Sequence, residues 1–354
     1  MHIPDGYLSP ATCAVLYAGA APFWYVALRR VKKALHTRLV PLISLFAAFS
    51  FVIMMFNLPL PGGTTGHAVG TGLAAVVLGP WAGMLAVSIA IMIQALFFGD
   101  GGITAIGANC LNMAVAGSLT AYAVYRVAAG RAAISSARRV AAAGLAGYAA
   151  INVSALLAAI EFGVQPLLYR DAAGAPLYCP YPLRVAIPAM MLGHLTIAGF
   201  AELTVSAGVV AFLQRSDPSL LLGTAGRGVA LTQPKAGRTL RPLWAGLGVL
   251  LVLTPLGILA TGSAWGEWAA RDFANAAARQ EIAASSLRQA APLTAPQGLA
   301  RLSQVWTAPF ARYAPPFVQS AAFGYVLSAM FGAGLVLLAC LMVSRVLVRK
   351  EPAT

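Results

Sequence analysis

The stretch SPATCAVLYAGAAPFWYVAL, residues 9–28, decides the fold class, because it has no charged side chain and is followed at once by the basic residues RRVKK at 29–33. At about 1.5 Å of rise per residue, twenty such residues cross the hydrocarbon core of a bilayer as a helix. The rest of the chain repeats this composition: 59% of the 354 residues are hydrophobic and 10% are charged. The sequence therefore predicts an all-α, polytopic transmembrane protein.

Further apolar runs predict about seven helices in residues 1–213. One of them, at 68–78, is too short to span the bilayer and is expected to be a partial or tilted helix before the break at Gly79-Pro80. A basic, Gly-rich linker at 214–242 is expected to follow. Residues 243–354 then predict two more membrane helices around an external domain at 263–320. The other predicted spans are 39–58, 81–97, 103–125, 140–160, 185–213, 243–260 and 321–343.

The charge distribution predicts the orientation. Most of the 24 Lys and Arg residues fall in alternate loops, as the positive-inside rule requires, which puts the N-terminus outside and the C-terminus in the cytoplasm of an inner-membrane protein. The formal charge of +14 follows from this bias, and we expect no nucleic-acid partner. The four cysteines stand singly along the chain, so they predict neither a disulfide framework nor a zinc site.

The first residues offer a metal chelate. A chain that begins Met1-His2 brings an α-amine, the His2 amide nitrogen and the His2 imidazole within a few bonds of one another. Three nitrogens in one plane suit a square-planar ion such as Ni(II) or Cu(II), and His67, which follows an external Pro- and Gly-rich loop, is the candidate fourth ligand. The ordinary alternative is a frayed terminus with a solvated histidine. Against it, Pro4-Asp5-Gly6 predicts a turn that folds the terminus back.

Nearby polar residues are candidates to support these ligands. A metal-binding histidine normally gives its second ring nitrogen to a hydrogen-bond partner. The candidates for that supporting role are Asp5, Asn57, Thr64, Thr65 and Asp100.

The remaining histidines have simpler interpretations. His36 lies among basic residues and is expected to be solvated, whereas His194 and Glu202 lie eight residues apart on one predicted helix. We interpret these two as a hydrogen-bonded pair that faces the interior of the bundle.

Catalytic signatures are missing from the sequence. It contains neither a phosphate-binding loop nor a His-Glu-x-x-His metalloprotease motif, so we expect no ATPase and no enzyme of these kinds. A metalloenzyme at the external face would need an open coordination position, which four nitrogen ligands do not leave in their plane. A stand-alone channel or secondary transporter is the alternative. It would carry ionisable residues through several spans or inverted repeats, whereas these spans hold almost no charge.

Three motifs together resemble a known family: MHIPDGYLS at 1–9, GTTGH at 63–67 and FGDGG at 98–102. They are similar to the substrate-binding membrane subunit of cobalt/nickel energy-coupling-factor (ECF) transporters, called CbiM or NikM, over residues 1–213. The resemblance implies an ABC importer whose T component and ATP-binding subunits are separate chains in or on the same bilayer. It implies that Met1, His2 and His67 bind the transported Ni²⁺ or Co²⁺, with nickel favoured by the continuation Ile-Pro-Asp-Gly.

The C-terminal part resembles the accessory subunit, CbiN or NikN, of the same transporters, which is sometimes fused to the first. TPLG at 254–257 and WGEW at 265–268 carry this resemblance, although the Pro-Asp-Gly sequence common after the first accessory helix is missing. The implied architecture is two helices with an external domain between them.

Overall fold

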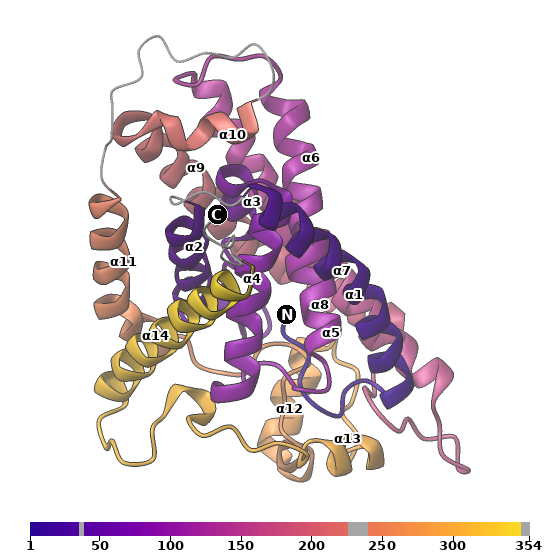
Figure 1. Ribbon diagram of the computed structural model, residues 1–354. Coiled ribbons are helices and arrows are strands. Elements are labelled where there is room, and N and C mark those ends of the chain that lie inside the picture. Colours follow the sequence, from indigo (N-terminus) through magenta and orange to yellow (C-terminus); the bar gives the residue numbers. More distant parts are fainter. Residues whose placement is uncertain (35–38, 226–239, 348–354) are drawn as a thin grey trace.

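The computed structural model describes residues 1–34, 39–225 and 240–347, and these residues form a helical bundle (Figure 1). The predicted all-α fold is confirmed. The α-helices are α1 Pro10–Ala34, α2 Leu39–Ile53, α3 Thr71–Leu78, α4 Pro80–Ile93, α5 Ile106–Asn109, α6 Gly117–Ala129, α7 Ala137–Leu168, α8 Leu183–Gly193, α9 Gly199–Ser216, α10 Leu222–Ala225, α11 Arg241–Leu253, α12 Ala276–Ser285, α13 Gln297–Leu302 and α14 Ala321–Leu347.

Six helical stretches of the described residues are long and apolar enough to cross a membrane. The chain is a multi-pass membrane protein, as its composition predicts. The six stretches are Pro10–Lys33, Pro80–Phe98, Ala137–Leu168, Leu183–Ser216, Arg241–Leu259 and Ala321–Arg345.

Helix α3 is the partial helix that the sequence predicts. It has eight residues. Gly70 precedes it with φ 77°, and Gly79 ends it with φ 81°, which are backbone conformations that L side chains rarely adopt. Pro80 then starts α4, where the missing N–H of proline does no harm.

The bundle interior is built on small residues of α7, which packs against α3, α6, α8 and α9. A Cβ on Gly72 of α3 would overlap the backbone of Gly147 of α7. Because neither residue has a side chain, the backbones of α3 and α7 approach closely.

Several helices contain short segments of other geometry that the sequence does not announce. Three π-helical segments, at Gln94–Phe98 (η1), Cys110–Ala116 (η2) and His194–Ala198 (η3), interrupt or end apolar helices. Short 3₁₀ turns lie at Pro218–Leu221 (η4), Thr254–Leu259 (η5), Ala270–Ala274 (η6) and Ala311–Tyr313 (η7). Such π-helical turns are frequent at functional sites.

Two loops differ from the prediction. Helix α7 continues to Leu168, so the loop expected to begin at Glu161 begins eight residues later, because the apolar sequence FGVQPLL extends the helix. The loop before His67 forms a small antiparallel hairpin, β1 Leu58–Leu60 with β2 Thr64–Gly66. His36 and residues 226–239 of the predicted linker 214–242 lie outside the described residues.

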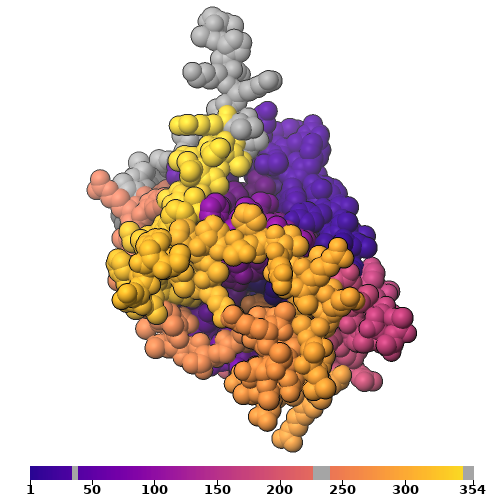
Figure 2. Space-filling model, turned by 90° about the horizontal axis from the view of Figure 1, so that it is seen from below, coloured from indigo at the N-terminus to yellow at the C-terminus, as the bar shows by residue number. Residues whose placement is uncertain are grey.

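The C-terminal segment is packed onto the first block. Helix α14 lies against α2, where the ring of Phe51 occupies the space that a side chain on Gly332 would need. Between α11 and α14 the chain passes across the end of the bundle where the N-terminus lies (Figure 1). Seen from that end, this orange and yellow segment surrounds a hollow in which the indigo and purple N-terminal block is visible (Figure 2).

Candidate metal-binding site at the N-terminus

The N-terminus is docked inside the protein rather than frayed. Met1 is 3% exposed, and His2 and Ile3 are fully buried. The Ile3 N–H donates to Asn109 Oδ1 at 2.8 Å, and Asn109 Nδ2 donates to the Ile3 carbonyl at 3.1 Å. The Gly102 N–H also donates to that carbonyl, at 2.9 Å. The Asn109 side chain therefore bonds to both backbone groups of Ile3, as a neighbouring β-strand would, with its amide oxygen as acceptor and its amide nitrogen as donor.

The Pro4-Asp5-Gly6 turn folds the terminus back, and Asp5 fixes it. The Asp5 carboxylate accepts from the backbone N–H groups of Ile103 at 3.1 Å and Thr104 at 2.8 Å. Gly6 has φ 88°, and a Cβ there would meet the backbone of Leu299 at 2.8 Å. The carboxylate of Asp5, predicted as a supporting residue of the site, thus bonds to Ile103 and Thr104 and fixes the turn.

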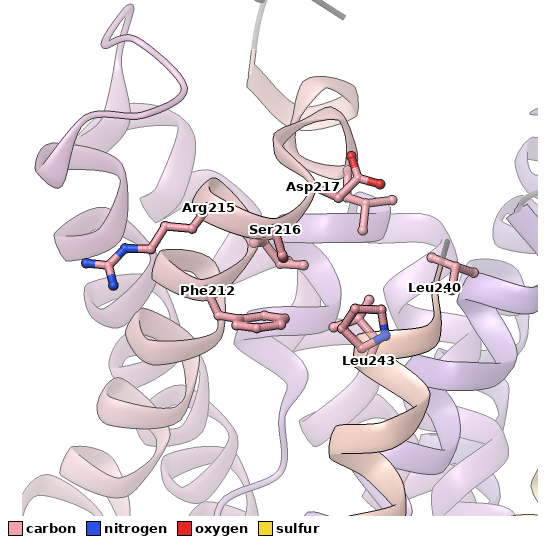
Figure 3. Close-up of a pocket in the computed structure, with 9 residues that line it drawn as sticks. Phe212, Arg215, Ser216, Asp217, Leu240 and Leu243 are labelled. Carbon is pink, nitrogen blue, oxygen red and sulfur yellow. The ribbon is translucent and has the colours of Figure 1, made fainter. Parts of the chain in front are cut away.

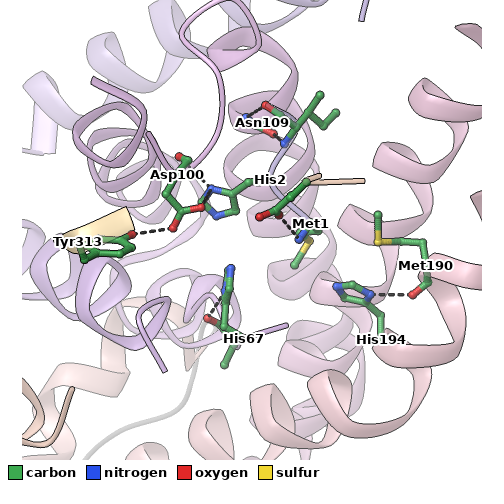
Figure 4. Close-up of polar contacts among 11 residues, drawn as sticks. Met1, His2, His67, Asp100, Asn109, Met190, His194 and Tyr313 are labelled. Carbon is green, nitrogen blue, oxygen red and sulfur yellow. Dashed lines mark hydrogen bonds and ion pairs between the residues drawn. The ribbon is translucent and has the colours of Figure 1, made fainter. Parts of the chain in front are cut away.

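The two histidines of the predicted chelate lie side by side (Figure 4). The ring centroids of His2 and His67 are 5.2 Å apart, edge to face. His67 Nδ1 lies 3.1 Å from the Ala68 carbonyl, so Nδ1 carries the proton and Nε2 presents its lone pair. His67 is thereby held in the tautomer that a metal ligand requires.

Two carboxylates face the predicted ligands. Asp100 Oδ1 lies 3.0 Å from His2 Nδ1, and Glu267 Oε1 lies 3.5 Å from the Met1 amine. The Tyr313 hydroxyl donates to Asp100 Oδ2 at 2.6 Å, and Gln94 Nε2 donates to the Tyr313 oxygen at 2.9 Å. The site therefore combines an amine and two imidazoles with two negative charges.

Burial and these charges set the protonation of the histidines. Burial lowers the pKa of His67 to about 3, and the nearby charges of His2 and the α-amine act in the same direction. Burial would also lower the pKa of His2, but the charge of Asp100 and its hydrogen bond outweigh burial and raise that pKa above 6.5. His67 is neutral at physiological pH, whereas His2 holds its proton more tightly than a free histidine.

The site opens into a cavity of about 510 Å³, which His67, Asp100, Glu267 and Tyr313 help to line. Asn57 and Thr65, two of the predicted supporting residues, also line it. The Thr65 N–H donates to the Ser263 carbonyl at 3.4 Å, which joins the His67 loop to the C-terminal segment. The hydroxyl of Thr64 donates to the Pro61 carbonyl at 3.5 Å, within its own loop.

A second cavity of about 510 Å³ lies where α9, η4 and the start of α11 meet (Figure 3). Its lining includes the apolar residues Phe212, Leu220 and Leu243 and the charged residues Arg215 and Asp217. It contains none of the predicted ligands.

The predicted pair of His194 and Glu202 is wrong. His194 Nδ1 lies 2.8 Å from the Met190 carbonyl, and Glu202 accepts from backbone groups at the start of α3. Both residues face the interior, and the π-helical segment η3 begins at His194. The two oxygens of Glu202 accept from the N–H groups of Val69, Gly70 and Gly72, so the carboxylate binds this backbone instead of His194.

Three residues of the site were not predicted from the sequence. Asn109 lies at the end of α5, while Glu267 and Tyr313 come from the C-terminal segment, 266 and 213 residues away from their partners. The only signal for Glu267 was its place in the WGEW motif at 265–268. Asn109 and Tyr313 had no signal beyond being polar residues in apolar surroundings.

Residues 2–220 match the family model described as the cobalt uptake substrate-specific transmembrane region. The chain belongs to this family. Residues 241–349 match the PDGLE domain, although the Pro-Asp-Gly sequence is missing after the first accessory helix. The two-part resemblance found in the sequence is therefore confirmed.

Relatives agree with this assignment to the cobalt uptake family. The chain is 60% identical over 336 residues to the fused nickel transport protein NikMN of Rhodobacter capsulatus, covering 95% of each chain. It is 35% identical over 224 residues to the cobalt transport protein CbiM of Geobacter sulfurreducens, covering 62% of this chain and 61% of that one. A crystal structure of a truncated transition metal transporter is 49% identical, with a TM-score of 0.57, over 60% of this chain and 98% of that chain.

Proposed function

We propose that this protein is the substrate-binding subunit of an ECF-type ABC importer and captures Ni²⁺, or alternatively Co²⁺, at the external face. One observation carries the proposal: the buried Met1 amine, the His2 ring and the His67 ring meet beside one cavity, with the carboxylates of Asp100 and Glu267 around them. The names of the nickel and cobalt transport relatives support the choice of metal.

In this proposal four nitrogens bind the ion: the Met1 amine, the His2 amide, the His2 imidazole and His67 Nε2. A chelate ring that joins the His2 amide to its own side chain closes through Nδ1, the nitrogen that lies beside Asp100. Binding therefore requires the His2 ring to turn and Nδ1 to exchange Asp100 for the metal. The negative charges of Asp100 and Glu267 favour a divalent cation at this position.

The C-terminal segment has a direct part in this proposal. Glu267 and Tyr313 both belong to it, and each contacts a group that touches the ion or its ligand. This segment then acts as the accessory part of the importer, which completes the site from outside. T component and ATP-binding subunits, supplied as separate chains, provide the energy, with the N-terminus outside and the C-terminus in the cytoplasm.

The position of a peptide tag tests the chelate. An extension before Met1 converts the α-amine into an amide, so the tagged protein should lose high-affinity Ni²⁺ binding, while a tag after Thr354 should leave it intact. Calorimetric titration of both purified proteins with NiCl₂ measures the difference, and mass spectrometry verifies that Met1 is retained. Equal affinity of the two tagged proteins would refute the proposal.

A further inference from the structure

The loop that carries His67 is tied to a buried carboxylate that has not been assigned any role. Glu202 of α9 is fully buried. Its Oε2 accepts from the N–H groups of Val69 at 2.7 Å and Gly70 at 3.0 Å, and its Oε1 accepts from the Gly72 N–H at 3.2 Å. These three donors belong to the backbone that follows His67 directly and begins helix α3.

Glu202 provides hydrogen-bond acceptors for N–H groups at the start of α3. The first N–H groups of a helix have no partner within it, and α3 begins inside the protein, where unpartnered N–H groups are costly. Gly70, with φ 77°, precedes the helix, and its side chain is only a hydrogen, so no residue of the loop itself caps the helix. A carboxylate from another helix supplies what a capping side chain supplies elsewhere, and the positive end of the helix dipole favours its negative charge.

Helices α3, α7 and α9 pack closely around Glu202 because glycines lie at their contacts. Gly72 lies where a Cβ would overlap Gly147, and a Cβ on Gly147 would meet Ser206 Oγ at 2.5 Å and the Glu202 carbonyl at 3.0 Å. Helices α3, α7 and α9 therefore meet backbone to backbone at this level, which brings Glu202 within reach of the start of α3.

We propose that Glu202 is the positioning residue of His67: by accepting from three N–H groups of the 69–72 backbone, it holds the His67 imidazole against His2 in the geometry needed to bind the metal ion. This inference rests on the proposed role of His67 as a ligand. Glu202 itself acts only through the loop, because its two oxygens are occupied by the three backbone donors.

The test compares Glu202→Gln with Glu161→Gln in the full-length protein. Glutamine keeps the shape but turns an N–H₂ group toward backbone donors, so the loop loses at least one bond. Nickel affinity should fall roughly 10- to 100-fold, the usual loss when a residue that orients a metal ligand is changed. Glu161 of α7 is the matched control, since it is a membrane-helix carboxylate that accepts from Asn112 Nδ2 at 2.7 Å and does not contact the His67 loop. The Glu161→Gln protein should bind Ni²⁺ with an affinity within about twofold of the parent protein, because substitutions at distant, independent sites do not couple.

A double variant separates positioning from general damage. If Glu202 acts through His67, then Glu202→Gln added to His67→Ala should weaken binding no further than His67→Ala alone. The absorption spectrum of bound Ni²⁺ in Glu202→Gln should likewise shift to that of His67→Ala, as water replaces the fourth nitrogen. Should Glu202→Gln not fold, Glu202→Asp is measured instead: its shorter side chain keeps the charge but cannot reach all three donors, and the same shift is expected.

The outcomes distinguish this inference from the proposed function. Full affinity of Glu202→Gln, or a loss that multiplies with that of His67→Ala, overturns the positioning role while His67 remains a ligand. Parent-like affinity of His67→Ala alone would instead refute the chelate, and the inference with it.

Discussion

Asn109 holds the first residues in place, and its substitution by leucine measures how much the docked terminus contributes to metal capture. Leucine has a similar size but can neither donate nor accept. The Ile3 carbonyl keeps its bond from Gly102, but the Ile3 N–H loses its bond to Asn109 Oδ1 at 2.8 Å. Leaving one buried N–H unpartnered costs about 1–3 kcal/mol, which changes the ratio of docked to undocked terminus by about 5- to 150-fold.

Only the form with a docked terminus can bind nickel. Once the undocked form is populated, the apparent dissociation constant for nickel rises as the docked fraction falls. Calorimetric titration of Asn109→Leu with NiCl₂, with thermal unfolding measured in parallel, tests this prediction. Asn152→Leu is the matched control: Asn152 is also buried but bonds within α7, to the Tyr148 carbonyl at 2.8 Å. Parent-like affinity of Asn109→Leu, or an equal loss in Asn152→Leu, would show that docking of the terminus by Asn109 is not what prepares the site.

Two further predictions concern the histidines. His2→Ala should weaken nickel binding more than His67→Ala, because it removes a ligand together with the ring that favours loss of the amide proton; calorimetry of both variants checks the order, and the reverse order would contradict it. Acidification should weaken nickel binding by protonating His2 rather than His67, because the pKa of His2 is raised above 6.5 while that of His67 is about 3. Asp100→Asn removes the charge that raises the pKa of His2, so the pH at which affinity is lost should move lower; an unchanged pH profile would count against this assignment.

The sequence predicts the helices of this protein well because a bilayer imposes a simple rule. Any run of about twenty apolar residues must satisfy its own backbone hydrogen bonds, so it becomes a helix. The same rule identifies 68–78 as too short, and α3 has eight residues. The rule does not predict where a helix ends outside the bilayer. Helix α7, predicted to end at Ile160, continues to Leu168.

The contacts within the site could be predicted only in part. The juxtaposition of His2 with His67 and Asp100 follows from loops that topology places on one face. The roles of Asn109, Glu267 and Tyr313 depend on packing across more than a hundred residues, which no local pattern encodes. The π-helical segments have no residue signature either. The α-helical period predicts His194 and Glu202 on one face, but it does not reveal that the Glu202 carboxylate binds the backbone at the start of α3.

Two contacts of the N-terminal site join residues far apart in the sequence, so they can form only late in synthesis of the chain. Met1 leaves the ribosome first, yet its amine contacts Glu267, and Asp100, the partner of His2, contacts Tyr313. Contacts so distant in sequence can form only after the later segment has been made, and they form slowly because long stretches of chain must be brought together. The first residues thus receive these contacts only after residues 267 and 313 have been translated. Chains that end before residue 267 lack the carboxylate that faces the Met1 amine, and chains that end before residue 313 lack the hydroxyl that donates to Asp100, so this set of contacts is complete only after translation has passed residue 313.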